Sequence, residues 1–180
     1  MTKNHAPALF PVVIINTGGT LNKRYNPLSG ELFVPSDDAA VMQLIRSAMP
    51  NLELHLLGAL HKDSLEMTDF DRRALAAIIQ SLPSAMASAP IIVVHGTDTL
   101  HLTAEYLDAA DLNRVVILTG AMQPVIIEPI EAALHLGLAL GFAAAEPQAG
   151  IYVAMHGRVL PYRALLKNRA LGVFQAVSTQ

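Results

Sequence analysis

Three short segments of the chain are continuously apolar and rich in β-branched residues: residues 12–15, 91–94 and 115–118. Strands that are buried on both faces, as in a parallel sheet, show such unbroken runs instead of alternating apolar and polar positions. Residues 52–57 and 150–155 are weaker strand candidates. The pattern therefore predicts a mostly parallel sheet of five strands.

Helical segments alternate with these strands. Ser36 can cap the first of them, and Thr68 with Asp71 resembles a capping box at the start of the second. The predicted helices span residues 36–49, 68–82, 99–110 and 128–144. Strands that alternate with helices predict an α/β fold, here a three-layer α/β/α sandwich around a mostly parallel, flavodoxin- or Rossmann-like sheet.

Length and composition indicate one globular unit. A chain of 180 residues suits a single domain, and no repeat or linker divides it, so we expect one domain over residues 1–180. Apolar residues make up 52% of the chain and charged residues 15%, which excludes a disordered tail. So few charges also suggest that another subunit covers part of the apolar surface.

Charge and cysteine content exclude several classes of protein. The 12 basic and 15 acidic residues give a net charge of −3, which offers no attraction for a nucleic acid. The chain has no cysteine, and therefore no disulfide and no thiolate metal site. No apolar stretch is long enough to span a membrane, and the first residues lack the features of a cleaved leader. We expect a cytoplasmic protein that binds neither nucleic acid nor membrane.

Two loops rich in glycine and hydroxyl side chains, residues 16–20 and 95–99, follow the first and third predicted strands. In a sheet with strand order 2-1-3-4-5, ligands bind beyond the carboxyl ends of these two strands. Glycines let a backbone approach a ligand closely and present N–H groups to it, although either loop alone reads more simply as a tight turn. Because two such loops converge, we expect the functional site there.

A nucleophile and a base can be assigned within this pattern. Thr20 or Thr97 could attack a substrate if a neighbouring group took the hydroxyl proton. Lys167 is the one lysine flanked by apolar sequence and could supply that group, unless it simply ends a helix or strand. Tyr25 lies in residues 17–36, which lack apolar periodicity and are long enough to form a functional lid or a disordered segment. Its side chain could move a proton or could only pack.

The histidines do not predict a metal site. His101 and Glu105 lie four residues apart on one predicted helix face, but no third ligand follows at a diagnostic spacing, so we expect no metal. His55, His135 and His156 are scattered and are interpreted as structural.

Five segments resemble, in the right order, signatures of the bacterial-type asparaginase/glutaminase family. They are TGGTL at 17–21, DSLEMT at 63–68, HGTDTL at 95–100, LTGAMQP at 118–124 and KNR at 167–169. They extend over nearly the whole chain, which is similar to the N-terminal catalytic domain of that family. The resemblance is strongest to a short-chain branch, and we expect no C-terminal domain.

The resemblance implies that L-asparagine is hydrolysed to L-aspartate and ammonia without a cofactor. Thr20 would attack the side-chain amide carbon, and Tyr25 would help to move its proton. Thr97, Asp98 and Lys167 would form a second group that handles protons.

The resemblance also implies a set of substrate-binding residues. Ser64 would hold the α-carboxylate of the substrate, and Asp98 its α-amino group. Gly19 and Gly96 would border the substrate, with backbone N–H groups of their loops stabilising the oxyanion. Ala121 would line the pocket.

The sequence also departs from the family's pattern. After Pro124 the usual Ser-Asp-Ala and Asn-Leu segment is replaced by a shortened loop and residues 129–136, and Leu65 stands where many members have a polar side chain. In that family the C-terminal domain, which we do not expect in this protein, usually supplies a carboxylate partner for the lid tyrosine.

The sequence therefore predicts an L-asparaginase that forms a homo-oligomer, a dimer or a tetramer. Two alternatives remain open: an amidase that prefers glutamine, and a non-catalytic amino-acid-binding or regulatory paralogue of the same fold.

Overall fold

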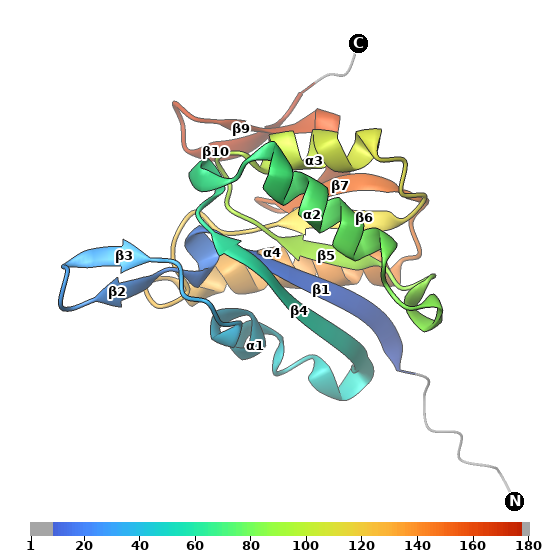
Figure 1. The fold of residues 1–180 in the computed structure, drawn as a ribbon, viewed down its shortest axis with the longest axis horizontal. Coiled ribbons are helices and arrows are strands. Elements are labelled where there is room, and N and C mark those ends of the chain that lie inside the picture. Colours follow the sequence, from blue (N-terminus) through green and yellow to red (C-terminus); the bar gives the residue numbers. More distant parts are fainter. Residues whose placement is uncertain (1–8, 178–180) are drawn as a thin grey trace, which may run out of the picture.

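The fold is built around a six-stranded sheet with the strand order β4-β1-β5-β6-β7-β8 (Figure 1). The computed structural model describes residues 9–177, so the expectation about the first residues lies outside the described part. The strands are β1 (Phe10–Gly18), β4 (Leu52–Lys62), β5 (Ile91–Val94), β6 (Val115–Thr119), β7 (Gly150–Met155) and β8 (Arg158–Pro161). All neighbours are parallel except β7 and β8. The five predicted strands and their order are confirmed, and β8 adds an antiparallel edge.

Four helices cover the two faces of the sheet. They are α1 (Ala39–Ile45), α2 (Asp69–Gln80), α3 (Leu100–Ala109) and α4 (Pro129–Ala144). One buried cluster joins α2 and α3 to Val13 and Ile15 of β1, and the other joins α1 and α4 to Val12 and Ile14. Successive residues of one strand thus point into opposite cores, which is why its sequence is apolar without a break. The predicted three-layer sandwich is confirmed.

The helix boundaries follow the local capping chemistry. Thr68 and Asp71 form the predicted capping box at the start of α2. Ser36, in contrast, was wrongly predicted to cap α1: the helix starts at Ala39, whose N–H donates to Asp37 Oδ1 at 3.0 Å. This helix is also shorter than predicted, because a 3₁₀ turn that includes Pro50 follows it.

Two hairpins lie outside the central sheet. Residues 17–36, predicted as an irregular lid, contain a 3₁₀ turn (Thr20–Asn22) and a hairpin of β2 (Arg24–Asn26) and β3 (Glu31–Phe33) that projects from the molecule (Figure 1). The second hairpin is made by β9 (Leu165–Asn168) and β10 (Val173–Ala176). Both have strands of only three or four residues, too short for a periodic pattern in the sequence.

Within residues 9–177, each helix is too short or too polar to cross a lipid bilayer.

Candidate functional site

The glycine-rich loops after β1 and β5 interlock at the carboxyl end of the sheet. Gly18 and Gly19 have φ values of +104° and +78°, which residues with a side chain rarely adopt. A Cβ atom on Gly18 would lie 2.6 Å from the backbone N and O of Lys62, and one on Gly19 would collide with the backbone of Gly96. The N–H of Gly19 also donates to the Lys62 carbonyl at 2.8 Å. The predicted convergence of the two loops is therefore observed.

A buried amide network holds the turn that starts at Thr20. Asn16 Nδ2 donates to Asn22 Oδ1 at 3.0 Å and to Asp38 Oδ1 at 2.8 Å. Asn22 Nδ2 in turn donates to Asn16 Oδ1 at 2.9 Å and to the Gly18 carbonyl at 2.6 Å. Thr20, the first residue of this turn, is half-buried. Sequence reasoning missed this network, although an asparagine at the end of an apolar strand was a visible signal.

Lys167 lies against the loop after β5, although about seventy residues of chain separate them. Its Nζ donates to Thr97 Oγ1 at 2.8 Å and to Asp98 Oδ1 at 2.9 Å. Only 12% of the lysine side chain is exposed, against 32% for that of Asp98. Arg169 donates to the Asp98 carbonyl at 2.9 Å. Because Thr97 Oγ1 accepts from the lysine, its own hydroxyl proton can be directed toward another group.

Ser64 brings a buried hydroxyl to the same loops. It is 1% exposed, and its Oγ has no hydrogen-bond partner among the described residues. A Cβ on Gly96 would lie 2.6 Å from this Oγ, and the Ser64 carbonyl accepts from Thr99 Oγ1 at 2.6 Å. An unpaired buried hydroxyl is costly unless a ligand satisfies it, so this atom is a candidate contact for a substrate.

His95 fixes the backbone just before Gly96. Its Nδ1–H donates to the Gly96 carbonyl at 2.7 Å, and its Nε2 accepts from Thr103 Oγ1 at 2.8 Å. Complete burial lowers the pKa of the ring to about 4, so the histidine is neutral near pH 7. Its role in holding the loop was not predicted from the sequence.

Ala121, which was expected to line the pocket, lies in a loop that packs against the loop after β5. It is fully buried in the loop after β6. The preceding residue, Gly120, packs so closely that a Cβ there would collide with the His95 carbonyl. The loop that carries Ala121 is therefore pressed against the loop that carries Thr97.

Tyr25 is a predicted catalytic residue that lies outside the central sheet. It lies on β2 of the projecting hairpin, is 58% exposed, and forms no side-chain hydrogen bond with another described residue. Hydrogen bonds join Lys167 to Thr97 and Asp98, and the Ser64 carbonyl to Thr99. Within the described residues no side-chain hydrogen bond joins Thr20 or Tyr25 to this group.

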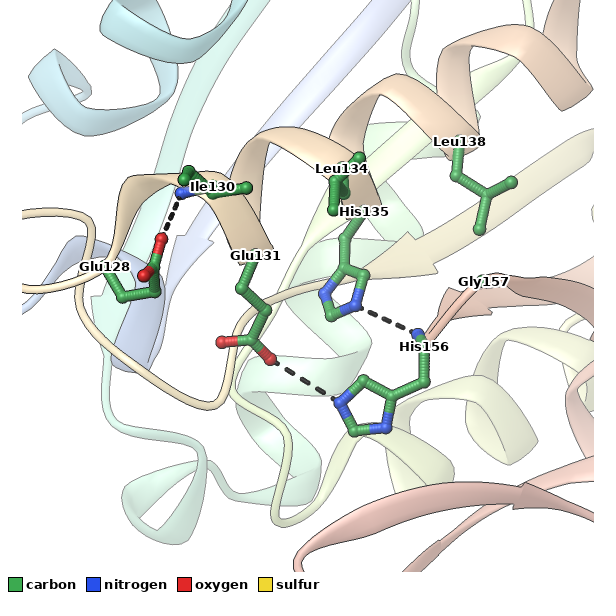
Figure 2. Close-up of a pocket in the computed structure, with 8 residues that line it drawn as sticks. All are labelled: Glu128, Ile130, Glu131, Leu134, His135, Leu138, His156 and Gly157. Atoms are coloured by element: carbon green, nitrogen blue, oxygen red, sulfur yellow. Dashed lines mark hydrogen bonds and ion pairs between the residues drawn. The ribbon is translucent and has the colours of Figure 1, made fainter.

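A second group of polar side chains lies beside an apolar groove of about 540 Å³ along α4 (Figure 2). Within residues 9–177, Glu131, His135 and His156 are the only three acidic or histidine side chains whose ligand atoms gather within 4.8 Å. His101 and Glu105, the pair considered from the sequence, are both exposed on α3 and have no such third partner in the described chain.

Comparison with known proteins assigns the family. The sequence profile described as "Asparaginase, N-terminal" matches residues 11–179. The chain belongs to the asparaginase family. The resemblance of its five motifs to that family is thereby confirmed.

Relatives of the chain carry different names. The chain is 31% identical, over 84% of its length, to a glutamyl-tRNA(Gln) amidotransferase subunit from Methanococcus maripaludis, and covers 36% of that protein. It is 26% identical, over 87% of its length, to the glutaminase-asparaginase of Acinetobacter glutaminasificans, and covers 49% of it.

Among solved structures, the thermostable L-asparaginase from Thermococcus kodakarensis superposes with a TM-score of 0.75 at 26% identity. This match covers 95% of the chain and 52% of that protein. The chain thus spans about a third to a half of the length of the relatives that it matches.

Proposed function

We propose that this member of the asparaginase family hydrolyses the side-chain amide of L-asparagine, with Thr20 as nucleophile. The observation that carries the proposal is the placement of Lys167 Nζ between Thr97 Oγ1 and Asp98 Oδ1, at 2.8 and 2.9 Å. A lysine that is hydrogen-bonded both to a buried threonine and to a carboxylate, beside two glycine loops, is suited to moving protons at an amide.

The proposed reaction begins with attack of Thr20 Oγ1 on the side-chain amide carbon. The hydroxyl proton would be relayed through the Tyr25 hydroxyl to the amide nitrogen, and the carbonyl oxygen gains negative charge. Backbone N–H groups of the Gly19 and Gly96 loops would stabilise this oxyanion, a contribution of about 3–4 kcal/mol for a well-placed donor. The C–N bond then breaks, the nitrogen leaves as ammonia after taking a proton, and an aspartyl ester forms on Thr20. Water cleaves this ester and releases L-aspartate.

The other polar groups would orient the substrate and its protons. The unpaired Oγ of Ser64 would bind the α-carboxylate, and the Asp98 carboxylate would bind the α-ammonium group. Thr97, which accepts from Lys167, would pass protons between the substrate and the lysine. Tyr25 would assist at Thr20 when the hairpin of β2 and β3 folds toward the site. The reaction so written uses no cofactor or metal.

Asparagine and glutamine carry the same amide group at the end of their side chains. The two substrates differ by one methylene group, which a pocket distinguishes by only about 1–3 kcal/mol. One relative is named glutaminase-asparaginase. A glutamine-preferring amidase is therefore the nearest alternative.

A second candidate function comes from the relatives named as subunits of glutamyl-tRNA(Gln) amidotransferases. In that case the same amide cleavage would serve the transfer of nitrogen to an acceptor. A non-catalytic paralogue that only binds an amino acid is the third possibility, but it gives no reason for the Thr97–Asp98–Lys167 arrangement.

We also propose that the chain forms a homo-oligomer through α4 and the loop before it. Ile126, Ile127, Ile130 and Leu134 are 56–66% exposed there. Large apolar side chains gathered in this way are typical of a surface that another protein covers. The cytoplasmic location expected from the sequence stays a prediction.

Ammonia release from L-asparagine and L-glutamine tests the proposal. We expect turnover of asparagine that is lost in Thr20→Ala and kept in the matched control Ser47→Ala, in the exposed turn after α1. Activity on glutamine alone would favour the first alternative. A folded protein that binds asparagine without releasing ammonia would overturn the proposal in favour of the binding paralogue.

A further inference from the structure

The position of Lys167 depends on a hairpin that is separate from the central sheet. Lys167 on β9 stands opposite Phe174 on β10. The N–H of Phe174 donates to His156 Nδ1 at 2.9 Å, and its buried ring meets the His156 ring edge-on, with centroids 5.9 Å apart. His156, in the turn between β7 and β8, therefore anchors the strand that faces the lysine.

His156 also points toward α4. Because its Nδ1 accepts the Phe174 N–H, the proton of the neutral ring is on Nε2. This Nε2 lies 3.5 Å from Glu131 Oε1 (Figure 2). The backbone N–H of His156 donates to His135 Nε2 at 2.9 Å, so the turn is attached to α4 at two points.

Glu131 and His135 hold the loop that contains Ala121. They lie four residues apart, on one face of α4. Glu131 accepts from the N–H groups of Met122 at 3.1 Å and Gln123 at 3.2 Å. The Nδ1–H of His135 donates to the carbonyl of Gly120 at 2.9 Å. The backbone is thus fixed on both sides of Ala121.

These contacts argue against a metal ion at the cluster. Both ring nitrogens of His135 and Nδ1 of His156 are already hydrogen-bonded to backbone groups. Only His156 Nε2 and the Glu131 carboxylate face each other, and a metal site needs at least three ligands with free lone pairs. The cluster is better suited to holding backbone segments together.

We propose that Glu131 and His156 are positioning residues that couple the hairpin of Lys167 to the loop of Ala121. The effect of this coupling on catalysis rests on the proposed function, whereas the coupling itself does not. Through these two side chains, the placement of the lysine and the shape of the opposite pocket wall depend on one another. Glu131 belongs to residues 129–136, where the sequence departs from the family's pattern. Side chains of this segment thus hold the loop that contains Ala121.

Backbone amide hydrogen exchange, measured by NMR on the full chain, tests the coupling without any activity. In Glu131→Gln a single carbonyl oxygen replaces the carboxylate, and we expect faster exchange at Phe174, which Glu131 does not touch. In His156→Asn the side chain still accepts from Phe174 but no longer reaches Glu131, and we expect faster exchange at Met122 and Gln123. Each acceleration should be about tenfold.

The pair formed by Glu53 and His55 on β4, 3.9 Å apart, provides a matched control. Glu53→Gln and His55→Asn should leave exchange at all three amides unchanged. If Glu131→Gln affects only Met122 and Gln123, and His156→Asn only Phe174, the two ends are not coupled and the inference is wrong.

Steady-state kinetics test the catalytic consequence. We expect kcat for L-asparagine to fall about tenfold in both Glu131→Gln and His156→Asn, because a small displacement of Lys167 is costly, with KM changing much less. The control variants should keep both constants. Unchanged kcat, despite coupled exchange, would overturn the positioning role. If the unmodified chain releases no ammonia, the proposed function fails, while the exchange data still decide whether the coupling exists.

Discussion

The ammonium group of Lys167 is held by Thr97 and Asp98 and is largely shielded from solvent. Lys167→Met keeps most of the side-chain volume but removes both hydrogen bonds. We expect kcat for L-asparagine to fall by at least about a hundredfold, the range for a group that moves protons, with little change in KM. Steady-state ammonia release checks this prediction, and full activity of the variant would exclude Lys167 from the chemistry.

Because His95 is buried, we expect the free energy of unfolding to decrease in acid. Burial lowers its pKa to about 4 in the folded state, whereas in the unfolded chain the ring titrates near its ordinary value of about 6.5. The unfolded state therefore binds more protons between these values. This contribution to stability is complete above about pH 6.5 and decreases by about 3 kcal/mol as the pH falls to 4.

Urea unfolding at pH 7.5 and pH 4.5 measures this effect. His95→Gln should be less stable than the unmodified chain at pH 7.5, but it should lose less free energy of unfolding on acidification. An equal loss in both proteins would show that His95 does not cause the acid sensitivity.

Among the secondary-structure elements, α2 has the start that is most clearly determined by local sequence, because a capping box marks it. Asp71 accepts from the Thr68 N–H at 2.8 Å and pairs with Lys62 at 2.7 Å, and these bonds lower the pKa of the carboxyl to about 2. Thr68→Ala should reduce the free energy of unfolding by about 1 kcal/mol. Ser36→Ala, at the position that does not cap α1, is the control and should have no effect in the same urea titration.

The central elements could be predicted because each carries its own local signal. Strands buried on both faces must be apolar at every position, and the box of Thr68 and Asp71 marks a helix start directly. The start of α1 was misplaced because Ser36, Asp37 and Asp38 are all good caps, and only the folded chain shows that Asp37 bonds to Ala39 while Asp38 accepts from Asn16.

The site could be predicted only where the family's motifs name its residues. Resemblance drew attention to Ser64, Thr97 and Lys167, and the fold brings their segments together. The cluster of Glu131, His135 and His156 could not be found in this way. Its members come from a helix and a distant turn, and their spacing in the sequence does not indicate that the folded sheet brings them into contact. The two hairpins were missed for a related reason: strand pairs so short have no periodicity.

At the scale of the whole molecule, the exposed apolar residues before and along α4 predict self-association. The unmodified chain should be a dimer or tetramer by light scattering at micromolar concentration. The double variant Ile130→Asp with Leu134→Asp should be a monomer, because it places charges in the middle of the apolar surface. Phe70→Asp, at an equally exposed apolar position on α2, is the control and should not change the mass. A monomeric unmodified chain would contradict the prediction.

Mass spectrometry of the acid-quenched reaction shows whether Thr20 becomes covalently attached to the substrate. The unmodified chain is mixed with L-asparagine, quenched during turnover, digested and searched for an aspartyl ester. We expect the ester on the peptide that contains Thr20, and no ester in Thr20→Ala. An ester on the peptide that contains Thr97, or ammonia release in Thr20→Ala, would contradict this expectation.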